Sequence, residues 1–165
     1  MAEIEIASTM PAFQSQLPYV PERIGAAAVY CSDGRVGEHF DDFLHAGLGL
    51  PRYDRIALPG GPACLAGHVK ARLNEQAVVE ELRFLVGAHG VNRIVLIAHH
   101  GCAFYAERLH LEVERMEAAQ KADLAKAARF IYRATGLAAI ESYFARPGDG
   151  HIAFEPVEAG PLKPF

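Results

Sequence analysis

The amino-acid sequence predicts an α/β fold: a mostly parallel central β-sheet flanked by helices, with an antiparallel C-terminal strand or hairpin. Two observations predict it. Short runs that are apolar throughout, typical of strands covered on both faces, alternate with longer stretches whose apolar residues recur at helical spacing. Near the C-terminus, two β-like runs flank Pro-Gly-Asp-Gly at 147–150, which is a hairpin-type turn signal. Alternating strands and helices favour parallel pairing through right-handed crossovers.

The individual elements follow from the same patterns. Three apolar runs are the predicted parallel strands: 24–30, 54–61 and 91–102. The stretches of helical spacing that separate or follow them are the predicted helices: 38–48, 66–89 (in one or two pieces) and 104–135. Gly136 follows the last helix as its expected C-cap.

Composition limits the class of protein. The chain has 165 residues, of which 51% are hydrophobic and 22% charged, as expected for one globular domain. Sixteen basic and twenty acidic residues give a net charge of −4, which does not suggest a nucleic-acid partner. No apolar run approaches the roughly 20 residues of a membrane span, and the N-terminus does not resemble a signal peptide. Three cysteines in a chain of this size favour a reducing compartment, so we expect a cytoplasmic protein.

The N-terminal residues differ from the rest. Residues 1–22 are polar and interrupted by Pro11, Pro18 and Pro21, so we interpret them as an arm that leads into a single α/β domain at 23–165.

Potential metal ligands lie at the ends of two predicted strands. Cys31 ends the first strand, and His99 and Cys102 stand three residues apart where the third strand leaves for its loop. Because ligands gather beyond the carboxyl ends of parallel strands, we expect these side chains to meet. Zinc prefers sulfur and nitrogen ligands, and three protein ligands leave the fourth position open, as in catalytic zinc sites. The sequence therefore predicts a Zn²⁺ site and makes 23–165 a zinc-binding domain.

Simpler interpretations apply to the other cysteine and histidines. A free cysteine is often a small buried hydrophobe, and Cys64 has no histidine or cysteine close by in the sequence. His100 either competes with His99 or lines the pocket. The remaining histidines are interpreted as surface or satisfied core residues: His39, His45, His68, His89, His110 and His151. Metal-free redox chemistry between Cys31 and Cys102 is the alternative to zinc, although neither lies in a C-x-x-C motif.

Asp33 and Arg35 follow the first cysteine in the segment CSDGR. An arginine held against a carboxylate fixes its orientation and keeps it ionised. Such an Asp33 either occupies the fourth zinc position or accepts a hydrogen bond from zinc-bound water. The alternative is a solvated salt bridge in a turn, worth under about 1 kcal/mol.

Together, CSDGR at 31–35 and HHGC at 99–102 resemble the β-class carbonic anhydrases, which carry C-x-D-x-R and, further along, H-x-x-C. The resemblance covers about residues 24–105 and identifies the chain as a divergent, short member. It implies that Cys31, His99 and Cys102 bind zinc and that Asp33 and Arg35 form the catalytic pair. It also implies a homodimer or a dimer of dimers, in which residues 1–22 pack on the partner subunit.

The resemblance implies a lyase that hydrates carbon dioxide reversibly to bicarbonate through zinc-bound hydroxide. Phe40 or Tyr105 is expected to wall its pocket. ALPGG at 57–61 departs from the family, which usually has an Arg-Asn-Ala-Gly type segment there, and Ala103 replaces a common glycine. Two alternatives therefore stay open: a zinc hydrolase of CS₂ or COS, and a catalytically weak zinc-binding or bicarbonate-sensing protein of the same fold.

Overall fold

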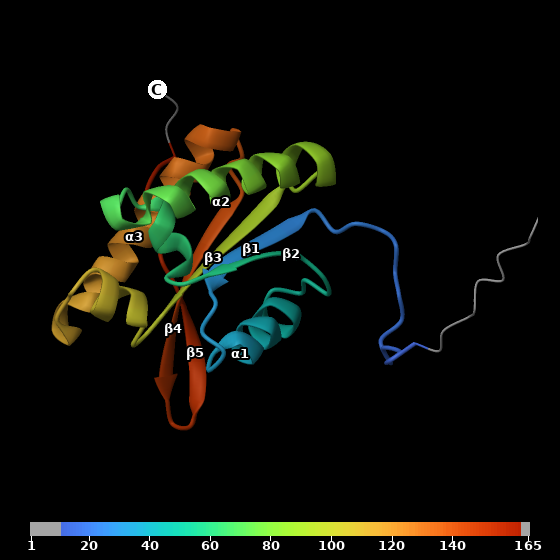
Figure 1. Ribbon diagram of the computed structural model, residues 1–165, viewed down its shortest axis with the longest axis horizontal. Helices are drawn as coiled ribbons and strands as arrows, with labels where there is room; N and C mark the ends of the chain where they lie inside the picture. Colours follow the sequence, from blue (N-terminus) through green and yellow to red (C-terminus); the bar gives the residue numbers. More distant parts are fainter. Residues whose placement is uncertain (1–10, 163–165) are drawn as a thin grey trace, which may run out of the picture.

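The computed structural model describes residues 11–162 and is built on one five-stranded sheet of order β2-β1-β3-β4-β5 (Figure 1). The strands are β1 (Ala26–Cys31), β2 (Asp54–Leu58), β3 (Arg93–His99), β4 (Ile140–Gly148) and β5 (His151–Pro156). β1 pairs in parallel with β2 and β3, β3 pairs in parallel with β4, and β4–β5 is an antiparallel hairpin. The predicted fold class is confirmed.

Helices connect these strands. The longer ones are α1 (Gly37–Asp42), α2 (Arg72–Phe84) and α3 (Val113–Thr135). Short 3₁₀ and π-helical segments extend or precede them: η1 (Phe43–Gly47), η2 (Gly61–Leu65), η3 (Val69–Ala71), η4 (Leu85–His89) and η5 (Phe104–Arg108). Gly136 caps α3 with a left-handed φ of 74°, as its position in the sequence predicts.

The structure differs from the prediction for one helix and for the ends of two strands. The helix predicted over 104–135 is divided into η5 and α3, because His110 has a φ of 56° and a right-handed helix requires a negative φ. The strands predicted over 54–61 and 91–102 end earlier, at Leu58 and His99. The Gly pair after β2 therefore forms a turn that leads into η2.

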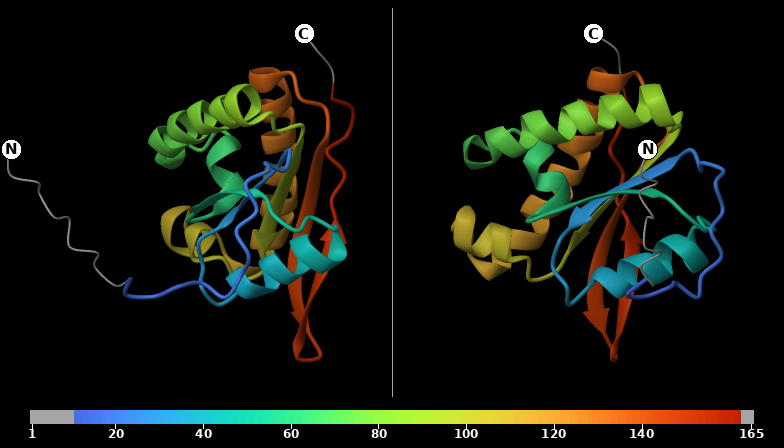
Figure 2. Two further views of the ribbon diagram at one scale, coloured as in Figure 1. Left: turned by 90° about the vertical axis from the view of Figure 1, so that its right-hand side faces the viewer. Right: turned by 45° about the vertical axis from the view of Figure 1, so that its right-hand side comes forward.

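The sheet is covered on both faces, with α2 and α3 on one side and α1 on the other (Figure 2). Successive strand residues point to opposite faces, so each strand contributes to two cores. In β1, Val29 and Cys31 pack in the core with α3, whereas Ala28 and Tyr30 pack in the core with α1. This double burial explains why the strands are apolar throughout.

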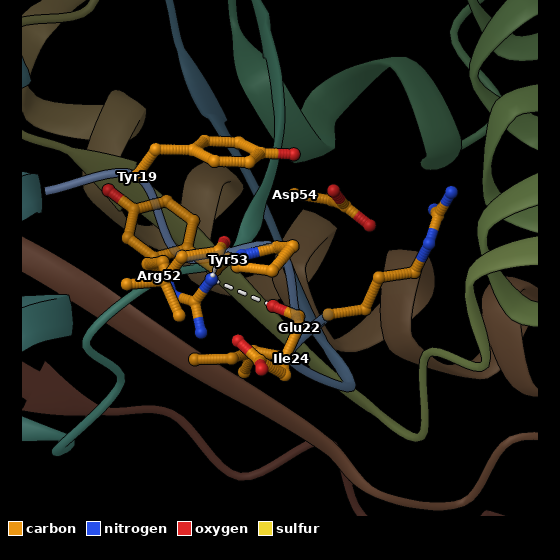
Figure 3. Close-up of a pocket in the computed structure, with 9 residues that line it drawn as sticks. Tyr19, Glu22, Ile24, Arg52, Tyr53 and Asp54 are labelled. Carbon is orange, nitrogen blue, oxygen red and sulfur yellow. Dashed lines mark hydrogen bonds between the residues drawn. The ribbon is translucent and has the colours of Figure 1, made fainter.

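Residues 11–22 form no helix or strand and are exposed. The guanidinium of Arg52 donates hydrogen bonds to two carbonyls of this segment, those of Val20 and Glu22 (2.6 and 2.7 Å; Figure 3). A hollow of about 320 Å³ lies between residues 19–24 and 52–54. It lies where β1 and β2 begin, and its lining has neither cysteine nor histidine. Residues 1–10 of the predicted arm lie outside the described residues, so its packing on a partner subunit stays a prediction. None of the helices between residues 11 and 162 is long and apolar enough to cross a membrane.

Candidate metal centre

Three side chains from two strand ends meet at the carboxyl edge of the sheet. Cys31 is the last residue of β1, His99 is the last of β3, and Cys102 lies in the turn after β3. Their ligand atoms lie within 4.8 Å of one another, and all three residues are buried. Within the described part of the chain, this is the one group of three or more His, Cys, Asp or Glu residues placed to hold a metal ion. The structure thus brings together the three residues predicted as ligands.

The imidazole of His99 has the tautomer that a metal ligand requires. Its Nδ1 lies 2.9 Å from the carbonyl oxygen of His100, and because a carbonyl only accepts, Nδ1 carries the proton. Nε2 therefore presents a lone pair, and this buried atom has no hydrogen-bond partner among residues 11–162. Leaving a buried polar atom unpaired costs about 1–3 kcal/mol, which a bound metal would offset.

The two thiols are spaced as zinc requires. Their Sγ atoms lie 3.8 Å apart. Two sulfurs each about 2.3 Å from a tetrahedral zinc are separated by about 3.8 Å. Cys31 Sγ has two hydrogen-bond partners, the Cys102 thiol and the backbone N–H of Gly60 (3.4 Å). The contact with Cys102 is the main reason that the pKa of Cys31 lies below its ordinary value. The same contact raises the pKa of Cys102. The donor set fits zinc.

The remaining cysteine and histidines stay apart from this group. Cys64 is fully buried in η2, and burial raises its pKa to about 12, as expected of a small hydrophobe. His68 pairs with Asp123 and His89 with Asp54, so both are satisfied as predicted. His100 is exposed, and its backbone rather than its ring supports the site, which makes His99 the candidate ligand.

Asp33 and Arg35 form a separate pair beside the three ligands. The Arg35 side chain donates to both carboxylate oxygens of Asp33, with Nη2 2.6 Å from Oδ2, and the Arg35 backbone N–H adds a bond of 3.0 Å. These bonds lower the pKa of Asp33 to about 2, with the guanidinium as the main cause. Among the described residues Asp33 does not belong to the ligand group, because its oxygens are directed to Arg35.

A hollow of about 220 Å³ opens next to the two cysteines. Asp33 lines it together with an apolar wall of Pro59, Ala103 and Phe104. Phe104 lines this pocket in place of Phe40 or Tyr105, which were predicted there.

The two aromatic residues expected to line this pocket, Phe40 and Tyr105, lie elsewhere. The ring of Phe40 lies 6.1 Å from the ring of His99, in the core with α1. Tyr105 is buried and donates its hydroxyl to Asp123. Neither lines the hollow beside the cysteines.

The Gly pair after β2 makes room for this wall. A Cβ on Gly60 would lie 2.5 Å from the Phe104 ring, and one on Gly61 would lie 2.5 Å from the backbone of Tyr30. Gly60 also has a φ of 82°, which disfavours any other residue. The two glycines therefore bring the turn against Phe104 and against the end of β1.

Comparisons with known proteins bear on the family and on the fold. Residues 22–145, most of the chain, match the model of the family described as "Putative carbonic anhydrase". The structure of β-carbonic anhydrase isoform I from the protozoan Trichomonas vaginalis is similar over 86% of this chain and 87% of that one, with a TM-score of 0.51 and 17% identity. The β-carbonic anhydrase of the fungus Aspergillus fumigatus aligns over 85% and 78% of the two chains, with a TM-score of 0.49 and 17% identity. Among curated protein sequences, none matches significantly.

Proposed function

This chain belongs to the carbonic anhydrase family whose model it matches, and on that premise we propose that it catalyses the zinc-dependent, reversible hydration of carbon dioxide to bicarbonate. One observation carries the proposal. A buried imidazole nitrogen without a partner among the described residues lies with two thiols at zinc spacing, beside a hollow that also holds an oriented carboxylate.

Cys31, His99 and Cys102 would hold the metal. When bound, zinc supplies a Lewis acid that makes water a nucleophile near neutral pH. Backbone groups of neighbouring residues would hold these ligand atoms in the state that binds the metal. The backbone of His100 fixes the His99 tautomer, and the N–H of Gly60 donates to Cys31 Sγ, which moderates the charge of the thiolate.

Asp33 would orient the attacking water. Its carboxylate stays ionised at neutral pH because Arg35 lowers its pKa, and it lines the hollow next to the cysteines. An ionised carboxylate accepts a hydrogen bond, which directs the lone pair of the water toward the substrate carbon. In this proposal Asp33 is not the fourth zinc ligand.

The apolar wall suits the substrate. Carbon dioxide has no net dipole, so contact with Pro59, Ala103 and Phe104 places it near the nucleophile without competing for hydrogen bonds. Bicarbonate is charged and gains nothing from the same wall. The guanidinium of Arg35 is already paired with Asp33, so it does not bind the bicarbonate product strongly.

Stopped-flow measurement of carbon dioxide hydration by the zinc-loaded protein tests this function, with Cys102→Ser as the inactive control. We expect a zinc-dependent rate well above that of buffer. A rate equal to that of buffer in a protein that retains its zinc would contradict the proposal.

The same apolar wall also favours a second candidate, the hydrolysis of CS₂ or COS, because these molecules share the linear shape of carbon dioxide. Sulfide release from CS₂ without turnover of carbon dioxide would replace the first proposal with this one. Stoichiometric zinc without turnover of any of the three would instead indicate a zinc-binding or bicarbonate-sensing protein.

We further propose a cytoplasmic homodimer or dimer of dimers in which residues 1–22 pack on the partner subunit. The three free cysteines suit a reducing compartment. Light scattering of the full chain and of a chain that begins at residue 23 tests the assembly. Loss of the dimer is expected in the shorter chain.

A further inference from the structure

Helix α3 places a buried amide against the backbone of the metal centre. We propose that Gln120 is a positioning residue: its side chain fixes the carbonyl of His99 and thereby sets the affinity of the site for metal. This inference rests on the proposed function only in assigning the metal to Cys31, His99 and Cys102.

The contact is short and isolated from water. Gln120 is 1% exposed, and its Nε2 donates to the carbonyl oxygen of His99 at 2.7 Å. The neighbouring positions on the buried face of α3 include Met116, Leu124 and Ala127. The buried positions of α3 also include the polar residue Asp123, which pairs with His68 and Tyr105. Gln120 instead contacts the strand residue that carries the imidazole ligand.

The carbonyl of His99 lies at the end of β3, where the pairing with β4 continues but the pairing with β1 has ended. The pairing of β1 with β3 ends at Tyr30 and Ile97, so His99 lies beyond it. The N–H of the next residue donates to Ala145 of β4, and backbone groups alternate along a strand, so the His99 carbonyl points away from β4. From there the chain turns through Gly101, with a φ of 68°, to Cys102. The amide of Gln120 therefore anchors the start of the turn that brings His99 and Cys102 together.

The stability that the Gln120 amide adds to the fold does not by itself explain why a polar side chain is buried here. A buried hydrogen bond contributes modestly, and an unpaired buried polar atom costs a comparable amount. The Oε1 of Gln120 is buried without a hydrogen-bond partner in the described residues, so the gain at one end of the amide is offset at the other. The main consequence of the contact is the orientation of the His99 backbone.

The test compares Gln120→Met with Ile131→Ala. Methionine keeps the length of the side chain and removes the donor. Ile131 is fully buried on the same helix, about 16 Å along its axis from Gln120, so its truncation weakens the fold away from the site. Zinc affinity is measured by competition with a chromophoric chelator, the absorption bands of the Co²⁺-loaded protein report the ligand geometry, and urea unfolding of the metal-free chain reports stability.

We expect Gln120→Met to bind zinc about 10–100-fold more weakly and to shift the Co²⁺ bands. Ile131→Ala is expected to lower the unfolding midpoint more than Gln120→Met does, and to change zinc affinity less than about twofold, as distant sites act independently. If Gln120→Met does not fold, Gln120→Asn carries the test, because its amide is one methylene too short to reach His99 and should weaken zinc binding similarly.

Wild-type zinc affinity and an unchanged Co²⁺ spectrum in the Gln120 variant would overturn the inference, as would an equal loss of affinity in Ile131→Ala. The outcome is separable from that of the proposed function. A wild-type protein that binds zinc but does not hydrate carbon dioxide contradicts the function and leaves the role of Gln120 intact.

Discussion

The three candidate ligands and the Asp33–Arg35 pair are neighbours at the carboxyl edge of the sheet, yet their polar atoms differ in hydrogen bonding. The ligands are at most 6% exposed, and Nε2 of His99 lacks a partner within residues 11–162. The Arg35 side chain is 73% exposed, and both oxygens of Asp33 accept hydrogen bonds. Nε2 of His99 lies with two thiols and is free to bind a metal, whereas both oxygens of Asp33 are already held by Arg35. The Asp33 side chain is only 18% exposed and lines the hollow, so the pair orients a carboxylate there, and its exposed guanidinium adds little stability.

The largest effect on zinc affinity is expected when one of the two ligand cysteines is replaced. Cys102→Ala should weaken zinc binding by at least about 10³-fold, because it removes one of three ligands from a site whose binding free energy is typically roughly 10–16 kcal/mol. Cys64→Ala is the matched control, since Cys64 is also buried but lies outside the ligand group. Chelator competition measures both affinities. Similar zinc affinity in the two variants would contradict the assignment of Cys102.

Replacing the carboxylate should separate metal binding from turnover. Asp33→Ala is expected to retain zinc and to lose about 10²–10³-fold in the rate of carbon dioxide hydration, because water is no longer oriented. Asp42→Asn, at an exposed position of α1, should leave the rate unchanged. Zinc content and stopped-flow rates are measured on the same preparations. Loss of zinc in Asp33→Ala would instead make Asp33 a ligand.

The pocket wall can be tested with two glycines of nearly equal φ. Gly60 and Gly67 have φ values of 82° and 83°, but a Cβ meets the Phe104 ring at Gly60 and no atom within 4 Å at Gly67. Gly67→Ala should cost about 1–2 kcal/mol of unfolding free energy from the left-handed backbone alone. Gly60→Ala should cost more and should also slow turnover, because the ring must move. Equal effects in urea unfolding and in turnover would remove the ring of Phe104 from the explanation.

The smallest effect is expected at an ionic cluster outside the group of three ligands. Hydrogen bonds from Arg146 and Lys121 lower the pKa of Glu117 to about 2. A carboxylate whose pKa is lower in the folded state stabilises the fold above its unfolded value of about 4.3, and this contribution is lost as the pH falls toward 2. Glu117→Gln should therefore flatten the fall in stability between about pH 5 and pH 2. Zinc affinity at neutral pH should be unchanged.

Urea unfolding of the wild type and of Glu117→Gln across that pH range measures the difference. Identical acid slopes would show that Glu117 does not contribute. A change in zinc affinity would show that satisfied surface pairs are coupled to the metal centre after all.

The sequence was sufficient for the fold class and for the three residues that the structure brings together, because doubly covered strands are apolar throughout and Cys31 and His99 interrupt that pattern. It was not sufficient for the ends of β2 and β3, which lie earlier than predicted. The break at His110 has no Gly or Pro signal, because a histidine takes the left-handed backbone conformation there. Phe104 and Gln120 were missed for another reason. Their roles come from contacts with Gly60 and with the carbonyl of His99, which are distant from them in the sequence.

X-ray absorption at the zinc edge, on protein purified without chelator, tests the central claim most directly. The geometry of Cys31, His99 and Cys102 predicts one zinc per chain with two sulfur ligands at about 2.3 Å and one imidazole nitrogen at about 2.0–2.1 Å. A light-atom ligand should complete the coordination. Protein without zinc, or zinc bound only by oxygen and nitrogen, would contradict it.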